Sequence, residues 1–427
     1  MSSPADTISF AGDVRIEEIT IINSRGFHQT ITTQVAGIEL YEDLFSPFIT
    51  GNIVVVDSVD LIGLFPLVGD EFIKLKFATP SLPTEDTYAG EYYIYKVSDR
   101  FKIAERQVAY TLHFISKEGL VDLNKKISKT YSGKISDIVQ NIISSQDALE
   151  TTKPINIEPT ANNTKYVSNF WTPVQNIMYL ANTAVNTNNS PSYVFFETKY
   201  GLNFVTLDSL YQLPVKAEFI WDNYSQDSAT MGSSYMNIDE DYKRILEIST
   251  PQVFNYIDRV ESGMYGSRMY HYDLTSKKYT TVNYNAKDKF SSGNHLNDYS
   301  IISNAYIGKP NALTIREHKY YGNFNGYGDV SNTKVVQHRV SLLKQAEAFK
   351  LEIVVPGRTD YTAGQKVNVK MFKMLNINES DDPEDVLDKM YSGNYLIGAI
   401  NHYITREKHE CKMELIKDSF MIDLDKE

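Results

Sequence analysis

Hydrophobic and polar positions alternate along the first quarter of the chain. Ile73, Leu75 and Phe77 are separated by lysines, and the apolar residues of 108–114 repeat that period of two. A period of two places successive side chains on opposite faces of a strand, so one face packs on a core and the other meets solvent. Gly26 marks a turn, and the β-branched run 53–56 predicts a strand buried on both faces. Residues 1–119 are therefore predicted to form one antiparallel β-module.

The hydrophobic period changes to that of a helix after residue 120. The apolar residues of 135–143 follow helical spacing, and Ser132 is placed to cap that helix. Thr172 and Gln175 form a T-x-x-Q capping box at the start of a second helix, with proline in its first turn. Residues 193–207 then predict a hairpin with its turn near 199–201. We interpret residues 120–243 as a helix-containing α+β domain.

A second β-module is predicted to begin at residue 244 and to be interrupted. Residues 286–334 are rich in Gly, Asn, Ser and Tyr and poor in aliphatic residues, most of all near 322–328. Such a segment holds too few apolar side chains for a core of its own. A short helix is predicted at 338–348, after which strands resume. The second β-module is therefore assigned to 244–285 and 335–427, with 286–334 as an inserted lobe.

The ends of the two β-modules resemble each other. Residues 88–94 (YAGEYYI) match residues 391–397 (YSGNYLI) at identical internal spacing. Before them, Gly69 and the strand with Ile73 correspond to Gly364 and the strand with Val367, with a spacing that differs by one residue. Further correspondences relate positions 110, 112 and 114 to 411, 413 and 415, and more weakly relate 51–57 to 266–273. Any two antiparallel meanders look partly alike, but three strands that agree in order favour a duplication.

A duplication sets the expected fold class and assembly. We predict an α+β, mainly β protein with two similar antiparallel β-barrel domains, a helix-containing domain and an inserted lobe. Three copies of such a chain would place six similar domains around an axis, so a trimer could match a six-fold partner.

Composition narrows the class of protein further. The 427 residues are 42% hydrophobic, include 30 tyrosines and carry a formal net charge of −12. An acidic chain is poorly suited to hold nucleic acid, because phosphate binding needs clustered Lys and Arg. The single cysteine cannot form an internal disulfide. No apolar run reaches the length of a membrane helix and no export signal is visible, so we expect a soluble protein with no stable membrane insertion.

Residues that could carry chemistry are scattered. No phosphate-binding loop or G-x-S-x-G nucleophile motif occurs, and the Gly-Lys pair at 133–134 lacks a preceding glycine loop. His402 and His409 are close in sequence, but we interpret them as residues of a strand surface and not as metal ligands. Cys411 is interpreted as a buried, inert thiol. No catalytic, cofactor-binding or metal-binding residue is assigned, and no cofactor is expected.

Two segments leave weaker alternatives open. The acidic run 379–388 lacks the glycine and ligand spacing of a calcium loop and is interpreted as a solvated loop. A carboxylate pair for glycoside hydrolysis needs only a fold to bring it together, but no particular pair is favoured. The tyrosine-rich lobe could stack on carbohydrate, although such loops more often pack against protein.

Several stretches resemble the baseplate hub proteins of contractile-tailed phages. They are residues 41–48 (YEDLFSPF) with Gly51 and Asp57, residues 64–71 (LFPLVGDE), residues 193–210, and residues 259–268 with Asp273. The resemblance covers most of the chain and is weakest over 286–334. It implies a trimeric hub of the T-even type, in which two β-barrel "tube" domains per chain form a ring that continues the six-fold tail tube. A spike trimer docks below that ring through its OB-fold, and VgrG proteins of type VI secretion carry the same hub fused to the spike.

The predicted function is therefore structural and not enzymatic. The expected partners are two further copies of the chain, a tail spike, tail tube or tube-initiator proteins, other baseplate proteins, and DNA only in passage through the channel. The expected location is the virion baseplate, after synthesis in the host cytoplasm. Lys74, Lys76 and Lys370 are expected to face the outer rim or a neighbouring subunit, because a basic channel would hold DNA. The alternatives are a peripheral baseplate or receptor-binding protein, a cell-wall hydrolase, and a tail-tube or terminator subunit.

Overall fold

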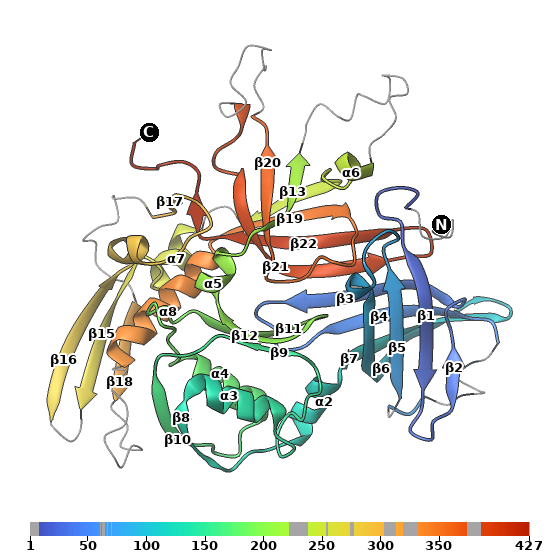
Figure 1. Cartoon of the computed structure of the whole chain (residues 1–427), viewed down its shortest axis with the longest axis horizontal. Coiled ribbons are helices and arrows are strands. Elements are labelled where there is room, and N and C mark those ends of the chain that lie inside the picture. The colour runs from blue at the N-terminus through green and yellow to red at the C-terminus, as the bar shows by residue number, and fades with distance from the viewer. Residues whose placement is uncertain are drawn as a thin grey trace.

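A mostly antiparallel sheet of thirteen strands runs through the described part of the molecule (Figure 1). The computed structural model describes residues 8–426, apart from residues 60, 62–64, 66, 70, 222–237, 253–254, 274–276, 303–312, 319–331 and 374–385. In Figure 1 the first β-module lies at the right, the α+β module below the sheet, and the segment between β14 and β19 at the left.

In the described residues, the first β-module contains seven strands. They are β1 (Arg15–Ile22), β2 (His28–Thr30), β3 (Val35–Asp43), β4 (Thr50–Asp57), β5 (Phe72–Ala78), β6 (Tyr88–Ala104) and β7 (Gln107–Ser116). Buried and partly exposed positions alternate along β3, β4, β5 and β7 as the sequence predicts. The prediction that 53–56 is buried on both faces is wrong: Ile53 and Val55 are buried, whereas Val54 is 40% exposed. A β-branched run shows strand propensity but does not show that both faces are covered.

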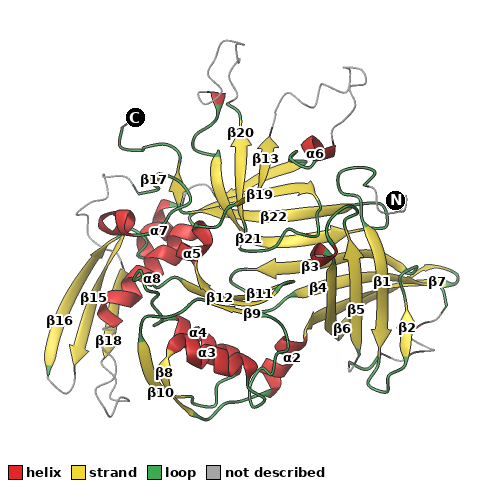
Figure 2. Cartoon of the chain, in the orientation of Figure 1, coloured by secondary structure: helices red, strands yellow, loops and turns green. Residues whose placement is uncertain are grey.

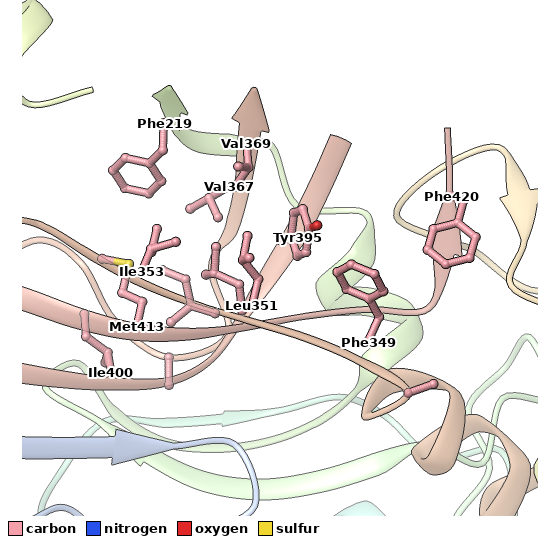
Figure 3. Close-up of a cluster of buried hydrophobic side chains, with 14 of the residues drawn as sticks. Phe219, Phe349, Leu351, Ile353, Val367, Val369, Tyr395, Ile400, Met413 and Phe420 are labelled. Carbon is pink, nitrogen blue, oxygen red and sulfur yellow. The ribbon is translucent and has the colours of Figure 1, made fainter. Parts of the chain in front are cut away.

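The second β-module is assembled from strands far apart in the sequence. They are β13 (Val215–Trp221), β14 (Glu247–Gln252), β19 (Phe349–Pro356), β20 (Lys366–Met371), β21 (Gly393–Ile404) and β22 (His409–Lys417). Their inward side chains form a cluster that includes Phe219, Val367 and Tyr395 (Figure 3). The helix-containing domain expected at 120–243 therefore contributes one strand, β13, to this module.

The same strand order occurs twice in the large sheet. The path β3-β4-β7-β6-β5-β1 has a counterpart in β14-β19-β22-β21-β20-β13. The register also repeats, since Ile73 is paired with Tyr92 and Val367 with Tyr395. Both long strands carry a register shift at equivalent points, after residue 94 in β6 and after residue 397 in β21. The last strand differs, because β1 is antiparallel to β5 whereas β13 is parallel to β20.

One part of the sequence correspondence was wrong. Residues 51–57 match β19 and not 266–273, because Ile53 pairs with Leu112 and Ile353 pairs with Met413 at equivalent places. Residues 266–273 form β15 in a separate three-stranded sheet. A short alternating run predicts a strand, but it does not identify the neighbour with which that strand pairs.

The α+β module lies between the two β-modules in sequence. Its elements are α2 (Lys117–Asn124), β8 (Thr130–Lys134), α3 (Ile135–Ser144), β9 (Ile155–Ile157), β10 (Asn163–Val167), α4 (Pro173–Ala181), β11 (Tyr193–Thr198), β12 (Gly201–Thr206) and α5 (Leu207–Tyr211). The predicted capping box on α4 is confirmed, with Thr172 and Gln175 bonded reciprocally. The predicted hairpin is also confirmed as β11–β12. Ser132 is not a helix cap, because it lies within β8 and Lys134 precedes α3.

The chain leaves the large sheet between β14 and β19. This segment contains α7 (Tyr256–Glu261), β15 (Gly266–Asp273), β16 (Lys278–Asn285), β17 (Tyr299–Ser300), β18 (Leu313–His318) and α8 (Asn332–Ala346), while α6 (Ile238–Asp241) precedes β14 and β23 (Ser419–Phe420) follows β22. This inserted segment therefore begins before residue 286, where composition predicted it to begin, and α8 is longer than the helix predicted at 338–348.

The glycine-rich stretch 322–328 and most of the acidic run 379–388 fall outside the described residues. Figure 2 shows α8 between the β15–β18 sheet and the rest of the molecule. Among the described helices, none combines the length and apolar character needed to span a bilayer.

Candidate functional site at the module junction

The two β-modules are joined edge to edge through backbone hydrogen bonds. The second half of β21, Ala399–Ile404, pairs with Asp43–Ile38 of β3, while the first half of β21 pairs with β20. Ile404 packs in the core of the first β-module, although its strand belongs to the second. The junction is thus part of the folded core and fixes the relative position of the two modules.

Glu42 on β3 is a buried carboxylate at which three parts of the chain meet. It accepts backbone N–H bonds from Lys199, in the β11–β12 turn, at 3.1 Å and from Ala363, ahead of β20, at 3.2 Å. The hydroxyl of Tyr88 on β6 donates to it at 3.3 Å. Burial raises the pKa of Glu42 to about 7, although the backbone donors oppose that rise. The sequence shows only an inward position on a strand here, so its acceptor role was not predicted.

A second buried ion network ties the α+β module to the first β-module. The Lys153 ammonium contacts Glu118 of α2 at 2.6 Å and also contacts Glu197 of β11. Glu197 in turn accepts the backbone N–H of Ile49 at 3.0 Å. The two carboxylate side chains are 3% and 1% exposed. A single lysine therefore pairs with two buried carboxyl groups, an arrangement that depends on all three side chains being present.

His402, His409 and Cys411 come together at the junction and are all fully buried. His402 is opposite Cys411 in the β21–β22 pair, and His409 is two residues from Cys411, so the three side chains share one face. His402 Nδ1 lies 3.0 Å from His409 Nε2, and Cys411 Sγ lies 3.4 and 3.6 Å from these atoms. The expectation that the histidines occupy a strand surface is wrong, whereas the burial of Cys411 is confirmed.

Aromatic rings of the first β-module cover this cluster. Tyr88 contacts His402 edge-on at 5.7 Å between ring centroids, and Phe77 contacts His409 at 6.2 Å. Burial lowers the pKa of both imidazoles and raises the pKa of the Cys411 thiol. Both histidines are thus neutral near pH 7, and the buried thiol stays protonated and is a poor nucleophile.

A cavity of about 1000 Å³ lies where the α+β module, α8 and the segment 282–295 meet. In its wall, His295 Nδ1 contacts Asp418 at 2.6 Å and His295 Nε2 contacts the carbonyl of Phe290 at 2.6 Å. Asp208 accepts both the backbone and side-chain N–H of Asn294. Both ring nitrogens of the histidine are occupied, so this ring cannot act as a general base without breaking a bond.

Lys417 is a fully buried lysine that sequence reasoning missed. Its ammonium lies 4.5 Å from the centroid of the Phe349 ring, with Tyr395 and Phe420 at 4.6 and 5.0 Å. Burial lowers its pKa strongly. Its place inside the second β-module, among aromatic rings, indicates a role in packing. A lysine at the end of a strand gives no sequence signal of this environment.

Lys74, Lys76 and Lys370, for which an outer position was expected, form ion pairs on partly exposed surfaces. Their partners are Glu91, Glu17 and Glu218 respectively, each at 2.7–2.8 Å. Such pairs contribute little to stability. These pairs within one chain do not show which way the three lysines face in an assembly. Their orientation toward a rim or a neighbouring subunit stays a prediction.

Comparison with known proteins gives a consistent picture. No family model matches the chain. The chain is 23% identical to the probable baseplate hub protein gp334 of Vibrio phage KVP40, over 94% of each sequence. Its fold is similar to that of the 43 kDa tail protein of prophage MuSo2 from Shewanella oneidensis, with a TM-score of 0.57, 9% identity, and coverage of 94% of this chain and 99% of the other. A tail protein from Neisseria meningitidis gives a TM-score of 0.53 and 11% identity, with coverage of 94% and 96%.

These similarities extend over nearly the whole chain. The resemblance to phage baseplate hub proteins that the sequence predicts is thereby confirmed. The fold is mainly β and is shared with phage tail proteins. The chain is thus similar along nearly its whole length to a probable baseplate hub protein, and it shares its fold with two tail proteins.

Proposed function

We propose that this chain is the central hub of a phage baseplate, a homotrimer that joins a six-fold tail tube to a three-fold spike. The observation that carries the proposal is the strand path that occurs twice in the large sheet. Three chains would supply six related β-modules around one axis. The similarity to a probable baseplate hub protein supports the same role.

The junction inside one chain suggests how neighbouring chains would join. Within the chain, β3 of the first module pairs with the second half of β21. In the repeated path β14 corresponds to β3, and the second half of β6 corresponds to the second half of β21. Pseudo-six-fold symmetry therefore calls for β14 of one subunit to pair with β6 of the next.

Both strands have an available edge in the described part of the chain. β6 pairs with β5 only through Tyr88–Tyr93, whereas its later residues pair with β7 alone. β14 ends the sheet path and pairs with β19. The free half of β6 exposes large hydrophobic side chains, among them Phe101 at 59% and Ile103 at 51%. An exposed apolar strand edge is a template for pairing with another chain.

The internal junction also fixes the expected register between subunits. Ile404 corresponds to Lys102, because they pair with the equivalent residues His409 and Val108, and Ile38 corresponds to Ile248. Ile404 and Ile38 are partners within the chain. Carrying that pairing across places Lys102 opposite Ile248 and Phe101 opposite Ser249. Pro251 lies where β14 shifts register, so the pairing is centred on Glu247–Ser249.

The remaining partners follow from the position of such a ring. The six modules would contact tail tube or tube-initiator proteins on one side and the spike on the other, among other baseplate proteins in the virion tail. DNA would pass through the centre, and a net charge of −12 suits a lining that does not hold phosphates. We expect Lys74, Lys76 and Lys370 to lie away from that lining.

Cysteine trapping tests the proposed contact directly. Phe101→Cys combined with Ser249→Cys places two thiols on facing strands of adjacent subunits, within disulfide reach. Mild oxidation of the purified double variant should give covalent dimers and trimers on a non-reducing gel. Each single variant serves as a matched control and should yield no trimer, because the native Cys411 is buried. A double variant that stays monomeric, or that forms only an intrachain disulfide, would contradict the strand pairing.

A further inference from the structure

We propose that His402, His409 and Cys411 bind a buried zinc ion at the junction of the two β-modules. The three candidate ligand atoms already lie within 4.8 Å of one another. They come from adjacent strands whose backbone pairing fixes their relative positions. The inference does not depend on the hub assignment, because it rests on the side chains of this chain alone.

The triangle formed by the three atoms has the size that tetrahedral zinc requires. Zinc binds imidazole nitrogen at about 2.0–2.1 Å and thiolate sulfur at about 2.3 Å, so ligand atoms lie about 3.3 Å (N to N) and about 3.6 Å (N to S) apart. The observed distances are 3.0 Å between the nitrogens and 3.4 and 3.6 Å from the sulfur to each. An ion could thus be accommodated with shifts of a few tenths of an ångström.

Among the described residues, the two candidate nitrogen ligands contact each other and the Cys411 sulfur. The opposite nitrogens of the two rings, His402 Nε2 and His409 Nδ1, are buried without a hydrogen-bond partner there. The Cys411 sulfur otherwise reaches only the carbonyl of Arg358, at 4.0 Å. Coordination through His402 Nδ1 and His409 Nε2 would fix the proton of each ring on its outer nitrogen, and the thiolate would balance one charge of the ion.

The backbone around His409 holds its ring in place. Its N–H donates to the carbonyl of Gly12, and its carbonyl accepts the N–H of Gly357, both at 2.8 Å. A Cβ at Gly357 would lie 2.3 Å from the ring, so only glycine fits there without a shift. The ligand is thus bracketed by the N-terminal segment and by the end of β19, which ties the ion to both modules.

Complete burial assigns the ion a structural role. All three ligands are 0% exposed, and rings of Phe77 and Tyr88 close the side toward the first β-module. Three protein ligands leave a fourth position that only an enclosed water could take. A zinc ion bound here would stabilise the contact between β21–β22 and the first β-module, and it would enter while the chain folds.

Metal content and a cobalt spectrum test the site. The intact chain, purified without chelator from zinc-supplemented culture, should carry about one zinc per chain by elemental analysis. The chain refolded with Co²⁺ should show a thiolate-to-cobalt charge-transfer band in the near ultraviolet. Since Cys411 is the sole cysteine, that band can arise only from this site.

Substitutions of the ligand residues distinguish zinc bound at this site from zinc bound elsewhere on the chain. Cys411→Ser and His409→Asn should each lower the zinc content by at least about tenfold. His338→Asn is the matched control, since His338 lies on α8 outside the cluster, and it should keep its zinc. If the ligand variants do not fold, the presence or absence of the cobalt band in the unaltered chain decides whether the site exists. Background zinc together with no cobalt band, or full zinc content in Cys411→Ser, would overturn the proposal in favour of a neutral hydrogen-bonded triad.

Discussion

At the scale of single residues, Glu42 couples protonation to the contact among three modules. Its pKa is raised from 4.5 to about 7 by burial, so folding favours the neutral form. The stability it contributes is fully present below about pH 4.5 and is lost as pH rises through about 7. Glu42→Gln removes this titration. In urea unfolding, the parent chain should therefore lose up to about 3 kcal/mol relative to Glu42→Gln between these pH values.

The control for Glu42 is a carboxylate that makes no such contact. Glu105 lies in the exposed β6–β7 turn, and Glu105→Gln should track the parent chain at every pH. If Glu42→Gln shows the same pH dependence as the parent, the carboxylate does not titrate in this range.

Substitution of Lys153 should also lower the free energy of unfolding. Lys153→Met removes the shared cation and leaves Glu118 and Glu197 without it, both nearly inaccessible to water. Because the lysine itself is 29% exposed, we expect a loss of roughly 3 kcal/mol in unfolding free energy, at the lower end for a broken buried pair.

Lys350→Met is the comparison, since Lys350 pairs with Glu414 at 2.8 Å where both side chains reach solvent. That change should cost no more than about 1 kcal/mol. Both losses in unfolding free energy are measured by chemical denaturation. Equal losses would show that the buried network stabilises the fold no more than an exposed ion pair does.

At the scale of elements, the free half of β6 and the edge of β14 should determine oligomer formation. The proposed register places Phe101 opposite Ser249 of the neighbouring subunit, and both side chains are exposed in the single chain. Phe101→Glu combined with Ser249→Glu should weaken trimer formation, because the pair places like charges on facing strands. Phe101→Lys combined with Ser249→Glu should restore it, because the facing charges are then opposite. Sedimentation velocity across a concentration series measures the effect.

Lys129→Glu, on an exposed residue of the α+β module, is the charge-matched control and should leave the oligomer unchanged. Recovery in the variant with opposite charges is the discriminating result, since a loss caused by the substitutions themselves would weaken both double variants alike. An unaltered oligomer in both double variants would show that the β6 and β14 edges do not meet in this register.

At the scale of the whole molecule, two related β-modules per chain predict the copy number in a tail. Three chains satisfy a six-fold tube, so quantitative mass spectrometry of purified particles should give about half as many copies of this chain as of tube subunits in one tube ring. A symmetry-resolved map of the baseplate should show three-fold density for the chain. One or six copies per tail would contradict the proposed hub.

The sequence by itself determined the local features of this protein. Hydrophobic periodicity identified the strands β4, β5 and β7 of the first module, the helix near 135–143 and the β11–β12 hairpin, and Thr172 with Gln175 marked the start of α4. The heptapeptides at 88–94 and 391–397 even predicted a shared register, since each provides the tyrosine that faces the preceding strand. These features depend on residues that are close in sequence, where side-chain alternation and capping act directly on the backbone.

Only the tertiary structure decided which distant segments meet. The edge pairing of β3 with β21, the contribution of β13 to the second module, and the separate sheet of β15 depend on the complementarity of whole faces, which no local pattern encodes. The same holds for the buried polar groups. His402 and His409 looked like surface residues, and Glu42 and Lys153 gave no signal, because the burial of a polar side chain depends on the partners that folding brings to it.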